Sequence, residues 1–381
     1  MNIKTVTALE YCKFVTDGTH DSPKVKNIGF KLITSKHLKR YEIDFDSANY
    51  ISEEDYKKVL ERSSVEQWDI LFSMIGTIGN IYIETNQEIN YACKNMGIFQ
   101  LGGDKMRSKW LYYYLQSPKA RSYIESVSRG TTQGYVPLGA LRKMPVDVVD
   151  DDIRNKIVTF LWELDEKIKA NIAINNNLEQ QAQALFKSWF VDFEPFDNKM
   201  PDDWTMSTLG NVSVMGAGGD KPQNVSQTKT DSYKYPIYSN GLNADGLYGF
   251  TDKPKIVEES VTVSARGTIG FVCLRHIPYV PIVRLVTLVP KTEIISAKYL
   301  YLWLKRLHIT GTGTTQQQLT VPDFQKTEIL VPSQETATLF TATVEPIFEK
   351  IWANQVENEK LSFLRDTLLP KLMSGELDVS N

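Results

Sequence analysis

Lys167-Ile168-Lys169-Ala170-Asn171 returns later in the chain as Lys350-Ile351-Trp352-Ala353-Asn354. Both copies lie in stretches where seam residues recur at alternating spacings of four and three. This heptad pattern is typical of a helix that buries one face against a partner helix. The first seam consists of Ile157, Leu161, Leu164, Ile168, Asn171, Asn175, Leu178, Ala182, Leu185 and Trp189; the second consists of Phe340, Val344, Ile347, Ile351, Asn354, Asn358, Leu361, Arg365, Leu368 and Leu372. Two long, related helices are therefore predicted.

The rest of the chain is duplicated in the same order. Gly76-Thr77-Ile78-Gly79 returns as Gly267-Thr268-Ile269-Gly270, residues 108–115 return as 297–304, and Gly130-Thr131-Thr132-Gln133 returns as Gly313-Thr314-Thr315-Gln316. A repeat of half a chain is not a solenoid, whose units run about 20–50 residues. The sequence instead predicts an α+β fold, in which two globular domains with pseudo-twofold symmetry are joined by two long helices.

The predicted boundaries are residues 1–150 for the first globular domain (head 1) and 196–330 for the second (head 2). The helical segments are 151–195 and 331–381. Head 2 begins where the first helix ends and finishes where the second begins. An antiparallel pair places both ends of head 2 at one end of the pair, whereas a parallel pair would force the chain back along its whole length. We therefore expect an antiparallel coiled coil.

Two pairs of asparagines indicate the register of that coiled coil. Asn171 should face Asn358, and Asn175 should face Asn354. A buried Asn layer lowers stability but fixes the alignment of the helices. Ile172 and Ile174 flank these positions and can shift the seam locally. Pro370 predicts a kink or an early end of the second helix, since proline lacks an N–H donor.

Within the heads, β-prone runs alternate with turn residues and short amphipathic stretches. Asp150-Asp151-Asp152 suits the positive N-terminal end of the first long helix, and Ser333 is a candidate N-cap of the second. The expected strands are 30–33, 69–73, 260–265 and 279–289; the expected short helices are 110–116, 120–127 and 297–306; residues 240–249 are expected to form loops.

Composition excludes several classes of protein. The hydrophobic content is 42%, and no apolar run approaches the ~20 residues of a membrane span. Cys12, Cys93 and Cys273 are isolated, which favours a reducing, cytoplasmic location. The net charge of −3 conceals a weak asymmetry, because the heads are slightly basic and the helical segments acidic. That asymmetry suits heads that meet phosphates, although solvated surfaces give the same pattern.

Motifs for catalysis are absent from the sequence. Gly216-Ala217-Gly218-Gly219-Asp220-Lys221 lacks the spacing of a phosphate-binding P-loop, and the chain has no Pro-Pro dipeptide, which excludes an amino-methyltransferase motif. The four histidines lie in no metal-binding pattern. Asp165-Glu166-Lys167, with Asp147 upstream, loosely resembles a nuclease motif, but such charges are expected on the surface of a helix. We expect no catalytic residue, metal or cofactor in this chain.

Candidate DNA contacts are found in the duplicated motifs and in basic residues of the heads. The Gly-Thr-Ile-Gly motifs can form tight turns that need glycine or can contact phosphates, and the hydroxyl- and amide-rich loops can contact DNA or merely connect elements. Trp110 and Tyr112–Tyr114 are better explained as core. The candidates are Lys31, Lys36, Lys39, Arg40, Arg129, Thr131, Thr132, Gln133, Lys221, Arg266, Thr314, Thr315, Gln316 and Gln317.

Several motifs together resemble the DNA-specificity (S) subunit of type I restriction-modification systems. They are Asp17-Gly18-Thr19-His20-Asp21-Ser22-Pro23, Trp68-Asp69-Ile70-Leu71 with Gly76–Gly79, Trp189-Phe190-Val191-Asp192-Phe193, Tyr235-Pro236-Ile237-Tyr238-Ser239-Asn240-Gly241, Ala265-Arg266 with Gly267–Gly270, and Leu368-Leu369-Pro370-Lys371-Leu372-Met373-Ser374-Gly375. The resemblance covers essentially the whole chain. One departure is that Asp17-Gly-Thr-His opens head 1 only, and Gly218-Gly219-Asp220-Lys221-Pro222 occupies the comparable place in head 2.

The resemblance implies that each head is a target-recognition domain reading one half of an asymmetric, interrupted site in double-stranded DNA. It implies a non-catalytic subunit that recruits two methyltransferase (M) subunits and joins motor-nuclease (R) subunits. S-adenosylmethionine, ATP and Mg²⁺ would then be bound by those partners. Two alternatives remain open at this point. The chain could serve a modification system with a fused methyltransferase-nuclease partner, or it could be a protein-binding scaffold that never touches DNA.

Overall fold

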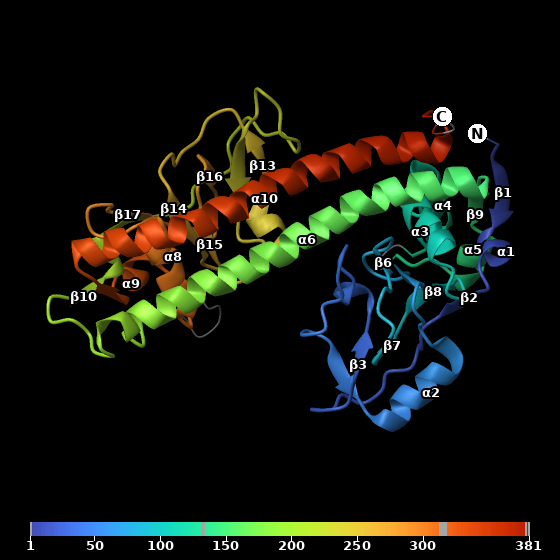
Figure 1. The fold of residues 1–381 in the computed structure, drawn as a ribbon, viewed down its shortest axis with the longest axis horizontal. Helices are drawn as coiled ribbons and strands as arrows, with labels where there is room; N and C mark the ends of the chain where they lie inside the picture. Colours follow the sequence, from blue (N-terminus) through green and yellow to red (C-terminus); the bar gives the residue numbers. More distant parts are fainter. Residues whose placement is uncertain (1, 131–133, 312–317, 378, 380–381) are drawn as a thin grey trace. The chain divides into compact units, whose positions relative to one another are not determined.

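The structure is a computed structural model that describes residues 2–130, 134–311, 318–377 and 379. The chain divides into two compact units (Figure 1). Unit 1 comprises Met1–Ile172 and Gln355–Asn381, and unit 2 comprises Ala173–Asn354. Each unit therefore contains one head together with part of each long helix. No described helix is long and apolar enough to cross a membrane.

The described residues of unit 1 form three small sheets. The largest has the strand order β2-β8-β5-β6, the second has the order β4-β3-β7, and β1 pairs with β9. All pairings are antiparallel except that of β3 with β7. The strands are β1 Lys4–Thr7, β2 Phe14–Asp17, β3 Phe30–Ile33, β4 Asn49–Ile51, β5 Ile70–Ser73, β6 Ile81–Ile83, β7 Tyr91–Cys93, β8 Met96–Gln100 and β9 Pro145–Val148. The helices are α1 Ala8–Tyr11, η1 Ser35–His37, α2 Glu53–Ser63, α3 Lys105–Tyr114, α4 Pro118–Val127 and α5 Leu138–Lys143.

Unit 2 repeats this topology strand for strand. Its sheets have the orders β11-β17-β14-β15, β13-β12-β16 and β10-β18, and among the strands that the structure describes in this unit only β12 and β16 pair in parallel. Its elements are β10 Thr205–Thr208, α7 Leu209–Val212, β11 Ser213–Ala217, β12 Tyr235–Tyr238, η3 Asn243–Gly246, β13 Leu247–Thr251, β14 Ser260–Ser264, β15 Val272–Arg275, β16 Val280–Pro281, β17 Leu285–Pro290, α8 Ala297–Arg306, α9 Val321–Phe324 and β18 Glu328–Val331, with η2 Glu194–Phe196 preceding them. The predicted duplication is thus present in the topology as well as in the sequence.

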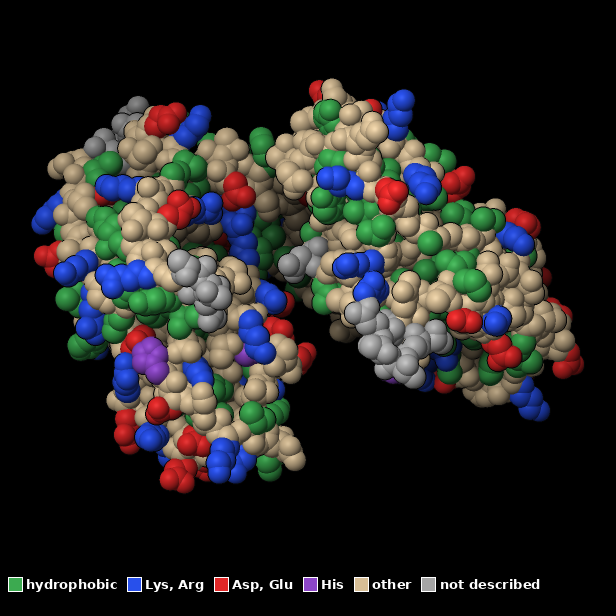
Figure 2. Space-filling view, turned by 180° about the vertical axis from the view of Figure 1, so that it is seen from behind, with side chains coloured by type: hydrophobic (Ala, Val, Ile, Leu, Met, Phe, Trp, Pro, Cys, Tyr) green, Lys and Arg blue, Asp and Glu red, His purple; other side chains and the backbone are tan. Residues whose placement is uncertain are grey.

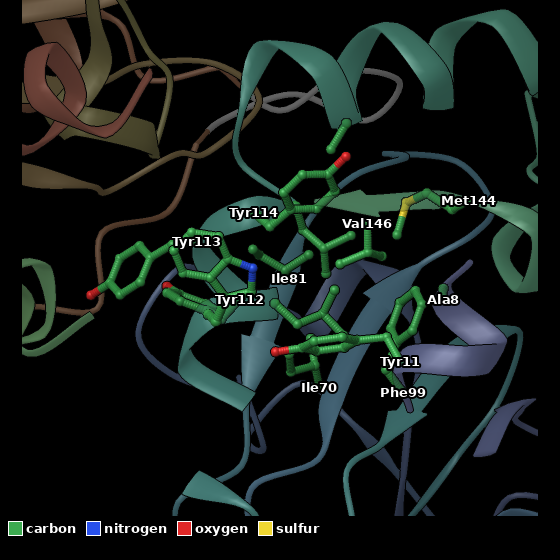
Figure 3. Packing of buried hydrophobic residues seen from close by; sticks show 14 of the residues in the cluster. Ala8, Tyr11, Ile70, Ile81, Phe99, Tyr112, Tyr113, Tyr114, Met144 and Val146 are labelled. Carbon is green, nitrogen blue, oxygen red and sulfur yellow. The ribbon is translucent and has the colours of Figure 1, made fainter. Parts of the chain in front are cut away.

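Helix α3 shows why the duplicated aromatic segment is buried. Asp104 caps the helix by accepting hydrogen bonds from the backbone N–H groups of its first turn. Trp110 and Tyr113 are fully buried in the core of unit 1, where α3 contacts β6 and β9. Figure 3 shows Tyr112, Tyr113 and Tyr114 among the residues of this core. The indole N–H of Trp110 donates to the Asp147 carbonyl at 2.7 Å, so burial leaves no orphaned donor. The prediction that this segment forms the core is confirmed.

The long helices are α6 (Asp151–Phe190) and α10 (Gln334–Ser374). In unit 1, the early part of α6 and the last turns of α10 share one apolar core; in unit 2, Phe186 of α6 packs against Phe340 at the start of α10. The two helices therefore run antiparallel, as predicted (Figure 1). The hydroxyl of Ser333 accepts a hydrogen bond from the Thr336 N–H at 3.3 Å and so caps α10.

The asparagines lie at the interface of the two helices. Asn171 donates to the amide oxygen of Asn358 at 2.9 Å within unit 1, and Asn354 donates to Asn175 at 2.8 Å within unit 2. Asn171 and Asn354 are each only 1% exposed. Ile172 and Ile174 are exposed, so the seam does not shift onto them.

Helix α10 continues through Pro370 to Ser374. Of the two predicted effects of Pro370, a kink or an early end of the helix, the early end is therefore wrong. Proline in a helix interior costs about 3 kcal/mol. Leu369, Leu372 and Met373 are buried in the core of unit 1, and each buried apolar side chain of this size contributes roughly 1.5–3 kcal/mol. Packing of the last turn therefore outweighs the cost of the missing hydrogen bond.

Two other expectations in head 2 need correction. The expected strand 279–289 is split into β16 and β17, because Arg284 between them has a positive φ of 74° that breaks the strand. The expected loop 240–249 contains η3 and the start of β13. Helix α8, in contrast, has the predicted bounds.

Candidate nucleic-acid interface

The Gly-Thr-Ile-Gly motifs form the same turn in both heads. One connects β5 to β6 and the other connects β14 to β15. Gly79 and Gly270 have φ values of 92° and 84°, and their N–H groups bond to the carbonyls of Ser73 and Ser264 at 3.1 and 3.0 Å. L-residues rarely adopt such φ values. The turn geometry therefore accounts for these glycines.

The second duplicated motif lies beside that turn. In head 1 the Val136 N–H donates to the Met74 carbonyl at 2.9 Å, and Ile75 forms a β-bridge with Tyr135. In head 2 the Leu319 N–H donates to the Ala265 carbonyl at 2.9 Å. Two motifs that are far apart in the sequence thus meet in each head. We call residues 74–80 with 129–130 and 134–136, and residues 265–271 with 318–320, the paired turns.

Half of the predicted contact residues cannot be placed. Thr131, Thr132, Gln133, Thr314, Thr315, Gln316 and Gln317 lie outside the described residues. Arg129, which precedes the first of these segments, is exposed, and its backbone pairs with that of Tyr135.

Two of the predicted lysines of head 1 lie beside the paired turns. Lys36 and Lys39 are exposed, and the Leu38 carbonyl between them accepts a hydrogen bond from the Asn80 side chain at 3.3 Å. Lys31 differs, because its ammonium donates to the Ala48 carbonyl at 2.9 Å and lies 3.8 Å from the centre of the Tyr50 ring. Lys31 is therefore held by the protein.

In head 2 the paired turns are held by a residue that the sequence analysis did not single out as a site. The Asn240 side chain donates to the Arg266 carbonyl at 2.7 Å, and its own carbonyl accepts from the Thr268 hydroxyl at 2.6 Å. Arg266 is half-buried, whereas Lys221 is exposed, with its ammonium 5.8 Å from the Tyr248 ring centre. The two heads thus share a turn but surround it with different side chains.

The motif beginning at Asp17 shows which feature the two heads share at this place. A Cβ on Gly18 would lie 2.4 Å from the Cys93 carbonyl oxygen, and one on Gly218 would lie 2.1 Å from that of Ile282. Both glycines therefore allow the same close approach of two backbones. The divergence around them leaves this shared requirement intact.

Beside Gly18, head 1 has a hollow of about 720 Å³ that the sequence analysis missed. Asp17 next to it is 4% exposed and pairs with Arg62 at 2.7 Å and with His20 at 3.0 Å. The basic side chains that line the hollow are Lys24, Lys26, Lys58 and Arg62. Lys24 and Lys26 come from the loop before β3, and Lys58 and Arg62 come from α2. No sequence motif indicates that these two segments lie together. In Figure 2, Lys and Arg side chains are spread over the visible surface, with acidic side chains among them.

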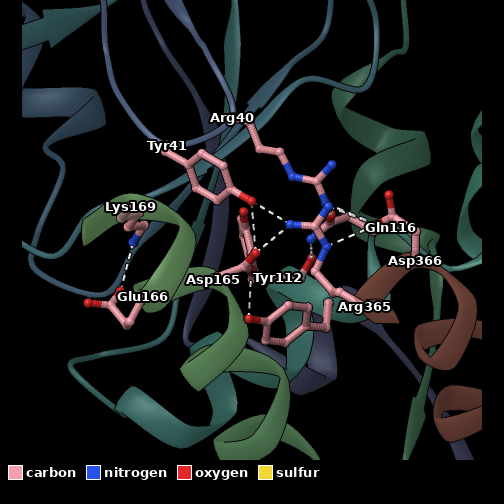
Figure 4. A network of polar contacts seen from close by, with 10 residues as sticks. Arg40, Tyr41, Tyr112, Gln116, Asp165, Glu166, Lys169, Arg365 and Asp366 are labelled. Carbon is pink, nitrogen blue, oxygen red and sulfur yellow. Dashed lines mark hydrogen bonds and ion pairs between the residues drawn. The ribbon is translucent and has the colours of Figure 1, made fainter. Parts of the chain in front are cut away.

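A buried network joins head 1 to the long helices within unit 1 (Figure 4). Asp165 of α6 pairs with Arg365 of α10, and the hydroxyls of Tyr41 and Tyr113 donate to the Asp165 carboxylate at 2.9 and 2.7 Å. Burial, and then the charge of Asp165, raises the pKa of Tyr41 to about 12. The expectation that Asp165 lies on a helix surface is therefore wrong. Its carboxylate forms a buried ion pair with Arg365.

Arg40, another predicted DNA contact, belongs to the edge of this network. Its guanidinium donates to Gln116 at 3.1 Å and to Asp366 at 3.4 Å. Among the described residues, no group of His, Cys, Asp and Glu is arranged to hold a metal ion. The three cysteines are buried and unpaired.

Comparison with known proteins defines the class. The chain matches the type I restriction modification DNA specificity domain twice, over residues 24–180 and 201–361. It therefore belongs to the family of type I restriction-modification specificity subunits. It is a non-catalytic DNA specificity subunit of a type I restriction-modification system. This assignment disagrees with both alternatives, a protein-binding scaffold that never touches DNA and a subunit of a system with a fused methyltransferase-nuclease.

Individual relatives agree with this assignment. The chain is 25% identical to the HindI specificity subunit of Haemophilus influenzae, with 83% of this chain and 88% of that one aligned. It is 26% identical to the MjaIX specificity subunit of Methanocaldococcus jannaschii, over 96% and 91% of the two chains. The fold is similar to the crystal structure of the type I S subunit from M. genitalium, with a TM-score of 0.58, 16% identity, and 98% and 96% of the chains covered.

Proposed function

We propose that head 1 and head 2 each read one half of an asymmetric, interrupted sequence in double-stranded DNA. The chain would recruit two methyltransferase subunits and would assemble with motor-nuclease subunits. S-adenosylmethionine, ATP and Mg²⁺ would be bound by those partners. The residue boundaries 1–150, 151–195, 196–330 and 331–381 describe the two target-recognition domains and the helical segments in this proposal.

One observation carries the proposal: the heads have the same strand topology and the same paired turns but differ in the side chains around them. A shared backbone frame suits a task common to both heads, such as contact with the sugar-phosphate backbone. Divergent surroundings suit the reading of two different base sequences. Identical half-sites would require no such divergence.

The paired turns and their neighbours are the proposed DNA-facing surface. In head 1 this surface includes the exposed residues Lys36, Lys39 and Arg129. Lys and Arg neutralise phosphates and supply affinity that does not depend on sequence. The hydroxyl- and amide-rich segments next to the turns are candidates for groove or phosphate contacts. Arg40 and Lys31 are weaker candidates, because the protein already binds their charged groups.

A domain exchange tests the proposal directly. Residues 1–145 are replaced by the equivalent head of a relative, and methylated adenines are mapped in the genome of a host that expresses the matching methyltransferase. Only one half of the methylated sequence should change. The control exchanges residues 205–330 and should change only the other half. If either exchange altered both halves, the two-headed reading would be wrong.

A further inference from the structure

The two heads meet the long helices at matched junctions, each of which buries a lysine. Lys109 of α3 and Lys298 of α8 occupy the same position in the duplicated segment, and they are 6% and 4% exposed. Each junction is completed by the residues just before β5 or β14 and by a long helix. The surroundings of the two lysines can therefore be compared position by position.

In unit 2 the chain neutralises its buried lysine. The Lys298 ammonium donates to both oxygens of Glu259, at 2.9 and 3.0 Å, and pairs with Glu345 at 3.0 Å. Trp352 lies beside it, with its ring centre at 5.2 Å. The buried ammonium of Lys298 is therefore neutralised by two carboxylates, as burial of a charge requires.

In unit 1 both carboxylates are missing. The positions that match Glu259 and Glu345 hold Trp68 and Trp162. The Lys109 ammonium lies 4.0 Å from the Trp162 ring centre and 5.9 Å from that of Trp68. Lys109 forms no hydrogen bond or ion pair with any residue that the structure describes. Cation–π contact stabilises the ammonium but supplies no acceptor for its N–H groups.

Two further lysines lie against the rings of this junction, whereas the carboxylates of Glu166 and Glu163 act on the pKa of Lys109 in the direction opposite to these lysines. The position that matches Trp352 holds Lys169, whose ammonium lies 4.6 Å from the Trp162 ring centre, and Lys105 lies 5.1 Å from that of Trp68. Glu166 pairs with Lys169 at 3.0 Å. Burial, and then the charge of Lys105, lowers the pKa of Lys109 to about 8. We call Trp68, Lys105, Lys109, Trp162 and Lys169 the cationic junction.

Trp68 is also held in an unusual backbone conformation. Its φ is +73°, which is rare for a bulky residue. Strain of this kind persists where the surrounding structure fixes it and is often found at binding sites.

We infer that the cationic junction binds a carboxylate carried by an acidic segment of a partner protein, the methyltransferase subunit. This inference rests on the proposed function. A phosphate of DNA is disfavoured because Trp68 precedes β5, whereas the paired turns follow it, so the two lie at opposite ends of that strand. In unit 2, Glu259 and Glu345 occupy the place of the incoming carboxylate. The two methyltransferase subunits would therefore bind with unequal affinity.

The test transplants the arrangement of unit 2 into unit 1. Trp162→Glu places a carboxylate where unit 2 has Glu345, and Trp162→Gln removes the same ring without adding charge. The full chain and purified methyltransferase subunit are titrated by calorimetry at two salt concentrations. We expect Trp162→Glu to weaken one of the two binding events at least tenfold relative to Trp162→Gln, and to reduce its salt dependence. The melting temperature of Trp162→Glu should not fall below that of Trp162→Gln.

A second readout reports on Lys109 itself. Selective isotope labelling of lysine follows its titration by NMR in the free chain and in the complex, with Lys109→Met to assign the signal. Binding of a carboxylate should raise the pKa of Lys109 by at least one unit. Equal methyltransferase affinity of the Glu and Gln variants would overturn the inference and leave the proposed function standing. So would weaker binding of Trp162→Glu to DNA alone with unchanged methyltransferase binding. Failure of the unmodified chain to bind methyltransferase would overturn both.

Discussion

Asp165 and Arg365 form an ion pair in which the side chains are only 2% and 1% exposed. Tyr41, Tyr113 and Asp366 complete the hydrogen bonds of the pair. The matching positions in unit 2 hold Phe348 and Ala182, so the same place in the fold is filled by apolar packing there. These two matched positions are thus polar in unit 1 and apolar in unit 2.

Removing one partner of the pair should destabilise the chain strongly. Arg365→Met leaves the Asp165 carboxylate buried and unpaired, which should cost about 3–5 kcal/mol of unfolding free energy. Denaturant unfolding of unit 1 measures this loss. The double variant Asp165→Phe with Arg365→Ala copies the residues of unit 2 and should recover most of it. A single variant within about 0.5 kcal/mol of the unmodified chain, the usual range for a surface substitution, would contradict a buried ion pair.

The buried asparagines are expected to lower the stability of the coiled coil and to fix the register of its two helices. Replacing Asn171 and Asn358 together by leucine removes two buried amides and should raise the unfolding midpoint, because apolar seams are more stable. Register is read by oxidative cross-linking of Leu161→Cys with Leu368→Cys, which share the register of Asn171 with Asn358. The cross-link should form cleanly with the asparagines present and give mixed products without them. A unique product in both backgrounds would show that the asparagines do not set the register.

Lysines near the paired turns should contribute to DNA affinity unequally. Lys36→Gln and Lys39→Gln should each weaken binding of the assembled methyltransferase to all sequences alike. Each should also reduce the slope of log affinity against log salt by about 0.9 per lost phosphate contact. Lys31→Gln is the matched control, since its ammonium is bound to Ala48 and Tyr50. An effect confined to one base of the recognised sequence would instead assign base contacts to these lysines.

Asp69 should make the stability of unit 1 depend on pH. Its side chain is fully buried, and burial raises its pKa to about 7, against the hydrogen bonds donated by the Glu66 and Leu101 backbones. A raised pKa means that folding favours the protonated acid. The stabilisation is fully present below the unfolded pKa of about 3.9 and is lost as pH rises through about 7. Burial lowers the pKa of His37 and His276, which acts in the opposite direction in both chains, so the unfolding midpoint of the unmodified chain is compared with that of Asp69→Asn between pH 4 and 8. The midpoint of the unmodified chain minus that of the variant should fall across this range, and a difference that rises would contradict the assignment.

Much of the fold could be predicted because its signals are local and repeated. The spacing of Leu161, Ile168 and Asn171 identified the seam of α6, and the same spacing around Asn354 supplied its partner. The order of the duplicated motifs then required two similar heads. The end of α10 was mispredicted at Pro370, because the rule that proline ends a helix considers only neighbouring residues. The core packing of Leu369, Leu372 and Met373, which keeps the last turn helical, depends on residues far away in the sequence.

The site was less accessible to sequence reasoning. The duplicated turns were identified, but no pattern shows that residues 74–80 lie against residues 134–136. The hollow beside Gly18 is lined by Lys24, Lys58 and Arg62, whose approach depends on how α2 packs. Arg365 was recognised as a seam position, but its partner Asp165 lies outside the heptad pattern. Such pairings depend on tertiary contacts between segments that share no periodicity.

The division of each long helix between two units has a consequence for synthesis of the chain. Unit 2 is one continuous segment, 173–354, so no later part of the chain is needed to complete it. Unit 1 needs residues from both sides of that segment. Asp165 is synthesised 200 residues before Arg365. At 5–20 residues per second, this interval of synthesis is roughly 10–40 s. During translation the Asp165 carboxylate and the apolar face of α6 in unit 1 therefore remain without their partners until the end of the chain is made, whereas unit 2 can close as soon as residue 354 has emerged.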